Sequence, residues 1–335
     1  MTIFYFIPFG LVYVIAAVVG SDHFRGLDPL NGSPNDEYYP QQKAYLEAIS
    51  VPKAWDILDS TSKRTPVTIA VIDDGVQADH PDLQGTVIKG YNVIDKNTDT
   101  HPRGPHGTMM AGIAGAIRNN KIGIAGIADH LRILPIYIGV KPALDPGVAA
   151  FEYLIAKRSD VRVILFSLGF KINYPPLLHK ILEAVSAGML VVVPAGNAHL
   201  DLDTAEYYPC SLNEPYMDGV ICAAATNGTK MQLDDESNFG SPVDIAAPGY
   251  RLLTTAPNGE YVKITGTSGA AAIIAGVAGM LYSLEASQHT KLTPGYIRSI
   301  IKKTATAGVM DNKRKKFLTF GRVNAEAAVR EILKK

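Results

Sequence analysis

Four side chains of this sequence are of the types that together perform nucleophilic hydrolysis: Asp73, His106, Asn197 and Ser268. A serine hydroxyl is a weak nucleophile and needs an imidazole to take its proton, and a carboxylate must fix the tautomer of that imidazole. An amide side chain and the backbone N–H of the serine can stabilise the oxyanion of a tetrahedral intermediate. Singly, each residue also fits a turn or a helix cap. Because all four lie at predicted strand ends or helix starts, they indicate one hydrolytic site.

The surrounding residues predict the elements that must position these groups. Short β-branched and apolar runs predict buried strands at 67–72, 133–138, 161–167, 190–194, 220–224 and 243–246. Helical patterns fall at 51–58, 106–117, 147–157, 175–187, 268–285 and 294–303. This alternation predicts an α/β fold of three layers, with a mainly parallel central sheet and helices on both faces. Ligands of such sheets bind at the carboxyl ends of the strands.

The predicted helix that starts at Ser268 consists almost entirely of small and apolar residues, which is typical of a buried central helix. The unpaired N–H groups at its start favour a developing negative charge. Upstream, residues 21–50 are polar and turn-rich, and we expect them to form an exposed arm over the domain surface.

The N-terminal residues 1–20 have the pattern of a signal peptide, because residues 3–20 are uncharged and apolar and the chain then turns polar. We therefore expect secretion, a short segment at 21–35 and a single domain at 36–333. Membrane association is expected only if the first segment stays uncleaved, since its apolar run is about long enough to span a bilayer. Cys210 and Cys222 could form one disulfide, as is common in secreted chains; two buried free thiols are the alternative.

The composition excludes several classes of partner. The 335 residues include 32 basic and 32 acidic residues, so the formal net charge of zero does not favour nucleic acid or an anionic membrane surface. No glycine-rich turn of the dinucleotide-binding type follows the predicted strand at 67–72. We expect a monomer that acts on protein or peptide substrates.

The sequence resembles the subtilisin-like serine proteases, the subtilases. The order aspartate, histidine, serine is the subtilisin order. The motifs that carry the resemblance are Val71–Gly75, His106–Gly112, Ala195–Asn197 and Gly266–Ser268, with further matches at Ser167–Gly169, Ala246–Gly249 and Gly321–Ala325. The similarity extends from about residue 35 to 333.

The resemblance implies a serine endopeptidase that works through an acyl-enzyme on Ser268. His106 would act as general base and then acid, Asp73 would orient it, and Asn197 would donate to the oxyanion. Asp74 would be a turn residue beside Asp73.

The resemblance also implies substrate-binding segments. Ser167, Leu168 and Gly169 would pair with the substrate backbone as an added strand. The primary specificity pocket would be bordered by Ala195, Gly196 and Tyr207. Nearby lie three acidic residues, Asp201, Asp203 and Glu206. They would favour a cationic P1 side chain if one carboxylate points inward. The alternative is a solvated acidic loop, with Tyr207 narrowing the pocket.

A calcium site follows from the same resemblance, because Ca²⁺ takes six to eight oxygen ligands. Asp82 and Asn120 would supply side-chain oxygens, and Asp36 would close the site from the N-terminal arm. The backbone carbonyls would come from Ile117, Ile122 and Ile124. For Asp36 the alternative is a solvated residue in a loose arm.

The chain departs from the family pattern at a few places. Met109 stands where relatives often have a second histidine, and Gly269 and Ala272 stand where they have methionine and proline. Only fifteen residues separate Gly20 from Asp36, whereas secreted subtilases have a propeptide of many tens of residues. A subtilase fold that binds peptides or partners without catalysis is therefore the alternative function.

Overall fold

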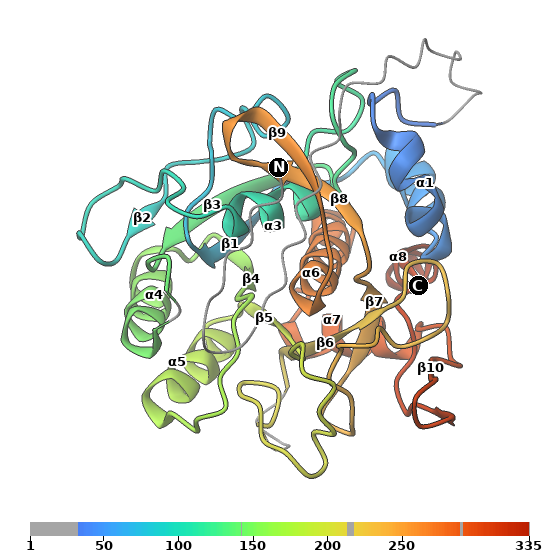
Figure 1. The fold of residues 1–335 in the computed structure, drawn as a ribbon. Helices are drawn as coiled ribbons and strands as arrows, with labels where there is room; N and C mark the ends of the chain where they lie inside the picture. The colour runs from blue at the N-terminus through green and yellow to red at the C-terminus, as the bar shows by residue number, and fades with distance from the viewer. Residues whose placement is uncertain (1–32, 142, 213–217, 289–290, 335) are drawn as a thin grey trace, which may run out of the picture.

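The computed structural model describes residues 33–334, except 142, 213–217 and 289–290. Its centre is a seven-stranded sheet in the order β2-β3-β1-β4-β5-β6-β7, and every pair of neighbours is parallel (Figure 1). The strands are Tyr91–Asn92 (β2), Leu131–Tyr137 (β3), Val67–Asp73 (β1), Val161–Leu165 (β4), Leu190–Pro194 (β5), Val220–Thr226 (β6) and Ile245–Pro248 (β7). This architecture confirms the predicted α/β fold. The predicted signal peptide lies outside the described residues.

Helices cover both faces of the sheet because successive side chains of a strand point to opposite faces. In β1, Ile69 and Val71 belong to one hydrophobic core, and Ala70 and Ile72 belong to the other. The second core is closed by α4 (Leu144–Lys157) and α5 (Pro175–Ser186). The first core is closed by α1 (Tyr39–Ala48), α2 (Val51–Asp59), α3 (His106–Gly115), α6 (Thr267–Ser283), α7 (Pro294–Lys303) and α8 (Ala325–Leu333).

Two antiparallel hairpins complete the fold, and the sequence patterns predicted neither. The first joins β8 (Leu252–Ala256) to β9 (Glu260–Ile264), and the second joins β10 (Met310–Asp311) to β11 (Lys316–Phe317). β8 supports the first turn of α3: the Thr255 hydroxyl donates to the Thr108 carbonyl at 2.7 Å, and the Thr254 hydroxyl donates to the Met109 carbonyl. The hairpin therefore holds the helix that begins at His106.

The exposed arm expected at residues 21–50 is wrong for its described part. Residues 39–48 form α1, which buries Tyr39, Tyr45 and Leu46 in the first core. Gln42 is also buried: its side chain accepts from the Ala125 N–H at 2.8 Å and donates to the Ala125 carbonyl at 3.1 Å. Tertiary burial of these few side chains outweighs the polar composition that suggested a loose arm.

α6 passes through the middle of the molecule. In Figure 1 the other elements surround it. It is apolar enough to cross a membrane, but all of its residues are buried in the fold. Small residues let α6 approach α3 closely. A β-carbon built on Gly276 would lie 2.6 Å from Ile127 Cβ and 3.0 Å from the Ala114 carbonyl oxygen of α3. Real side chains do not fit in that space.

Cys210 and Cys222 form a disulfide. Cys222 belongs to β6, so the bond attaches the irregular segment around Cys210 to the central sheet. The sequence allowed either a disulfide or two free thiols, and the structure has the disulfide.

The close contact of α6 predicts how the protein responds to a single added methyl group. In an open helix, Gly→Ala stabilises by about 1 kcal/mol. At Gly276 we expect the reverse, a loss of about 1–3 kcal/mol, because the methyl group overlaps fixed atoms. The measurement is the midpoint of guanidinium unfolding.

The matched control is Gly147→Ala in α4, where the nearest atom is a flexible Leu177 methyl group 3.3 Å away. Gly147→Ala should leave the midpoint unchanged or raise it slightly. Equal midpoints for Gly276→Ala and Gly147→Ala would show that the α3–α6 contact is not tightly packed.

Candidate active site

Asp73 and His106 form the central hydrogen bond of the site. Asp73 ends β1 and His106 begins α3, so a strand end and a helix start bring them together. His106 Nδ1 lies 2.7 Å from Asp73 Oδ2, and Asp73 is 4% exposed. Burial alone would lower the pKa of His106, but the Asp73 carboxylate raises it above its ordinary value of 6.5. His106 Nε2 is buried and has no hydrogen-bond partner among the described residues.

Ser268 lies in the first turn of α6, whose N-cap is Gly266 rather than the serine itself. Its side chain is therefore not used as a cap. Ser268 is 5% exposed, and its Oγ lies 3.5 Å from the Ser167 carbonyl oxygen. A bond to His106 Nε2 is not formed among the described residues, as is common for catalytic groups before substrate binds. The hydroxyl therefore lies between the start of α6 and the segment that follows β4.

Asn197 is held so that its amide nitrogen remains available. Its Oδ1 accepts from the Thr267 backbone N–H at 2.9 Å and from the Thr267 hydroxyl at 2.8 Å. The same hydroxyl accepts from the Gly196 N–H at 3.1 Å. Asn197 Nδ2 faces the backbone of Gly266, 3.2 Å from where a β-carbon would stand. Thr267 thus fixes the Asn197 side chain, a role that the serine motif alone does not reveal.

The sequence suggested that Asp74 is only a turn residue, but its carboxyl group also contacts the start of α3. Its Oδ2 accepts from the His106 backbone N–H at 3.0 Å, and its Oδ1 accepts from the Gly107 N–H at 2.7 Å. The carboxyl group therefore caps α3 from outside the helix. Burial and the neighbouring Asp73 carboxylate both raise the pKa of Asp74 well above its usual range. The sequence showed two adjacent aspartates, but not that the second would hold the helix of His106.

The proposed substrate-binding segments lie side by side because they continue adjacent strands. Ser167, Leu168 and Gly169 follow β4, and Ala195 and Gly196 follow β5. Ala195 remains attached to the sheet, since its N–H donates to the Ala223 carbonyl at 2.8 Å.

Asn238 also fixes these segments, and sequence reasoning missed it. It is fully buried; its Nδ2 donates to the Ala195 carbonyl at 2.7 Å. Its Oδ1 accepts from the N–H groups of Ala198 and Leu200 at 3.1 and 2.8 Å. Asn238 lies in the polar run 234–241, where no local pattern sets it apart, so only the tertiary structure reveals this contact.

The acidic residues after Asn197 use their carboxylates away from the cleft. Asp201 pairs with Arg314 at 2.9 Å. Asp203 Oδ1 accepts from the Ser241 N–H at 2.8 Å, and Glu206 is exposed beside Tyr208. The side chain that enters the space between the two substrate-binding segments is Tyr207. These positions favour the alternative of an acidic loop with a narrowed pocket.

The proposed calcium ligands converge at one place. Asp36 and Asp82 are 3% and 0% exposed, so Asp36 does not lie in a loose arm. Asp36 Oδ2 accepts from the Asn119 N–H at 3.0 Å. Asp82 Oδ1 accepts from Asn120 Nδ2 at 2.8 Å, and its Oδ2 accepts from the Ile124 N–H at 2.7 Å.

The same loop includes Ile117 and Ile122, whose backbone carbonyl oxygens are two further proposed calcium ligands. Ile117 donates its N–H to the Asp82 carbonyl at 2.9 Å, and Ile122 donates its N–H to Asn120 Oδ1 at 3.0 Å. Burial, and to a lesser degree Asp36, raise the pKa of Asp82 to about 6. Within the described ranges, no group of three or more histidine, cysteine, aspartate or glutamate side chains forms a metal cluster. Any metal here would therefore depend on amide and carbonyl oxygens.

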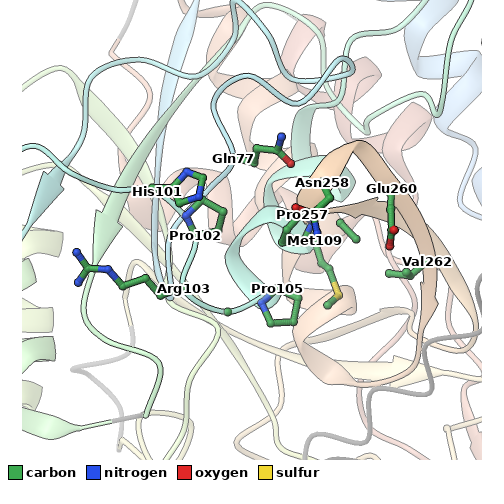
Figure 2. A pocket seen from close by; sticks show the side chains of 12 residues that line it. Gln77, His101, Pro102, Arg103, Pro105, Met109, Pro257, Asn258, Glu260 and Val262 are labelled. Carbon is green, nitrogen blue, oxygen red and sulfur yellow. The ribbon is translucent and has the colours of Figure 1, made fainter. Parts of the chain in front are cut away.

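A cavity of about 450 Å³ lies beside the start of α3, and the triad does not line it. Figure 2 shows Met109 between the loop that carries Arg103 and the β8–β9 hairpin, with Asn258 and Val262 opposite. Met109, where relatives often have histidine, therefore gives this cavity an apolar wall on the side of α3. Asp73, His106, Asn197 and Ser268 are not among the residues that line the cavity.

Comparison with known proteins identifies the family. A model of the subtilase family matches residues 64–321. Thermitase from Thermoactinomyces vulgaris is 35% identical over 306 residues, covering 89% of this chain and 99% of that protein. The major intracellular serine protease of Bacillus subtilis is 33% identical, over 71% of this chain and 75% of that protein.

A solved structure of a protease from Pseudoalteromonas arctica has a TM-score of 0.75 and 27% identity, covering 89% of this chain and 99% of that one. The chain therefore belongs to the subtilase family and is a serine endopeptidase with a subtilisin-like fold.

Proposed function

We propose that this chain hydrolyses peptide bonds through an acyl-enzyme on Ser268, and that it acts as a secreted monomer on proteins or peptides. The observation that carries the proposal is the buried Asp73–His106 hydrogen bond, with Ser268 and Asn197 at the same edge of the sheet. A carboxylate bound to Nδ1 fixes the tautomer in which Nε2 can accept a proton.

In the proposed first step, His106 Nε2 takes the proton of Ser268 Oγ as the oxygen attacks the substrate carbonyl. The Asn197 amide and the Ser268 N–H donate to the oxyanion, and Thr267 keeps the amide in place. His106 then gives its proton to the departing amine, leaving the acyl-enzyme. In the second step, His106 takes a proton from a water molecule, which attacks the acyl-enzyme and releases the carboxylic acid product and free Ser268. Asp73 keeps its hydrogen bond to His106 Nδ1 throughout.

Secretion is supported by two observations. The apolar residues 3–20 have the pattern of a signal segment, and the Cys210–Cys222 disulfide is compatible with an oxidising compartment. Relatives differ in this respect, since one is named as intracellular.

We also propose that the loop at 117–124 binds Ca²⁺ together with Asp36 and Asp82. The residues present fit a hard cation, because two carboxyl groups are buried close enough for Asp36 to raise the pKa of Asp82. Asn120 and the carbonyls of Ile117, Ile122 and Ile124 would supply the remaining oxygens. When bound, the ion would neutralise the buried charge and fix the N-terminal segment to the domain.

Removal of the nucleophile tests the assignment of Ser268. In Ser268→Ala, hydrolysis of a fluorogenic peptide should fall by about 10⁶ in kcat, and labelling by a fluorophosphonate probe should disappear. Ser299→Ala, an exposed serine on α7, should keep full labelling. Wild-type protein that folds but is neither labelled nor active would favour the non-catalytic alternative. Persistent labelling of Ser268→Ala would show that another residue is the nucleophile.

The charges beside His106 predict the pH dependence. The base acts only when neutral, and Asp73 and Asp74 both raise its pKa, so the acid limb of kcat/KM should lie above pH 6.5. In Asp74→Asn this limb should move to lower pH, while the amide oxygen can still accept one of the two N–H bonds at the start of α3. The measurement is the pH profile of kcat/KM.

Asp79→Asn is the control, because it removes one exposed carboxylate from the same segment. It should leave the profile unchanged. A limb that does not move in Asp74→Asn, or moves as far in Asp79→Asn, would contradict the electrostatic coupling of Asp74 to His106.

Calcium should stabilise the protein whether or not it is active. At one hundred times its Kd, a bound ligand adds about 2.7 kcal/mol, so a chelator should lower Tm by several degrees. Asp82→Asn should abolish this response to Ca²⁺, whereas Asp79→Asn should retain it. Equal Tm values with Ca²⁺ and with chelator in the wild-type protein would rule out the site.

A further inference from the structure

The ring of Tyr207 fills the space between the two substrate-binding segments. A β-carbon built on Gly169 would lie 2.2 Å from Tyr207 Cε1 and 2.7 Å from its hydroxyl oxygen. A β-carbon built on Gly196 would lie 2.8 Å from the same Cε1. The ring therefore packs against the bare backbone of both glycines. Its burial raises the pKa of the Tyr207 phenol to about 12.

On the proposed peptidase function, this space is the one that a P1 side chain would enter. The scissile carbonyl has to lie between Ser268 Oγ and the Asn197 amide, and Ser268 Oγ already borders the Ser167 carbonyl. A substrate strand paired along Ser167–Gly169 then directs its P1 side chain between that segment and Ala195–Asn197. The ring of Tyr207 lies in this slot, against Gly169 and Gly196.

The backbone around Tyr207 is attached to the fold at several points, so the ring is not carried by a loose loop. Tyr208 and Phe170 exchange two backbone hydrogen bonds, at 2.7 and 2.8 Å. The Tyr207 N–H donates to the Ser211 hydroxyl at 2.9 Å, and Ser211 returns a bond to the Tyr207 carbonyl at 2.9 Å. Cys210 is linked by its disulfide to β6.

We propose that Tyr207 closes the inner part of the primary specificity pocket and restricts the enzyme to glycine or alanine at P1. This inference rests on the proposed peptidase function. A larger P1 side chain would overlap the ring, and the nearby carboxylates of Asp201 and Asp203 bind Arg314 and Ser241 rather than facing the slot. Glu206 is exposed to solvent beside Tyr208. A cationic P1 side chain therefore lacks the room that it would need beside the ring.

The test is a series of fluorogenic peptides that differ only at P1, with glycine, alanine, leucine, phenylalanine or lysine. For the wild-type protein, kcat/KM for alanine should exceed that for leucine, phenylalanine and lysine by at least about tenfold. Tyr207→Ala and Tyr207→Gly should raise kcat/KM for leucine and phenylalanine by at least about tenfold. Tyr207→Phe keeps the ring and should keep the wild-type preference.

Tyr296→Ala, which truncates an exposed tyrosine on α7, is the control for losing an aromatic ring elsewhere and should not alter the preference. Wild-type turnover of phenylalanine or lysine at P1 as fast as alanine would overturn the proposal, since it would show that the ring moves aside. Unchanged preference in Tyr207→Gly would overturn it as well.

Binding separates this inference from the proposed function. The same P1 series is titrated against Ser268→Ala, in which no turnover is needed. Tighter binding of the alanine peptide than of the phenylalanine peptide, reversed by adding Tyr207→Gly, supports the pocket even if wild-type protein is not labelled by fluorophosphonate. If the wild-type protein is labelled and active but shows no such difference in binding or kcat/KM, the P1 inference is contradicted and the proposed peptidase function is not.

Discussion

The close packing of α3 against α6 is the contact on which the rest of the site depends. His106 begins one helix and Ser268 lies in the first turn of the other, so the relative position of the two side chains follows from how the helices meet. Glycine and alanine at the contact let the backbones approach; Gly276 has no room for a methyl group against Ala114 and Ile127. Core packing of this density transmits small shifts rather than absorbing them. The proposed base and the proposed nucleophile are thus positioned by residues that have no proposed chemical role.

The second constraint is the parallel sheet, which brings three strand ends to one edge. β1 ends in Asp73, β4 continues into Ser167–Gly169, and β5 continues into the segment that carries Asn197. The charge at this edge is costly, because Asp73 and Asp74 are adjacent and buried. The fold offsets that cost with donors: His106 Nδ1 contacts Asp73, and the first N–H groups of α3 contact Asp74. The helix start therefore serves both carboxyl groups.

Polar side chains hold the segments that we propose to bind substrate. Thr267 binds both Asn197 and Gly196, and Asn238 binds the backbone on either side of Asn197. Preorganised donors of this kind need no rearrangement when charge develops on a bound carbonyl. The disulfide and the Phe170–Tyr208 backbone pair fix the neighbouring segment in the same way. The region around the cleft is therefore irregular in backbone but tightly connected.

The sequence by itself determined the fold class and the residue types of the proposed active site. Buried parallel strands are continuous apolar runs and α6 is a run of small residues, so both are visible as local patterns. The tertiary structure decided what local patterns do not encode. The β8–β9 hairpin and α1 are stabilised by contacts far apart in sequence. Asp74 could be assigned to its helix, and Tyr207 to its slot, only once β1, α3 and the ends of β4 and β5 were placed together. A residue type limits the chemistry that is possible, whereas its partners follow from packing between distant segments.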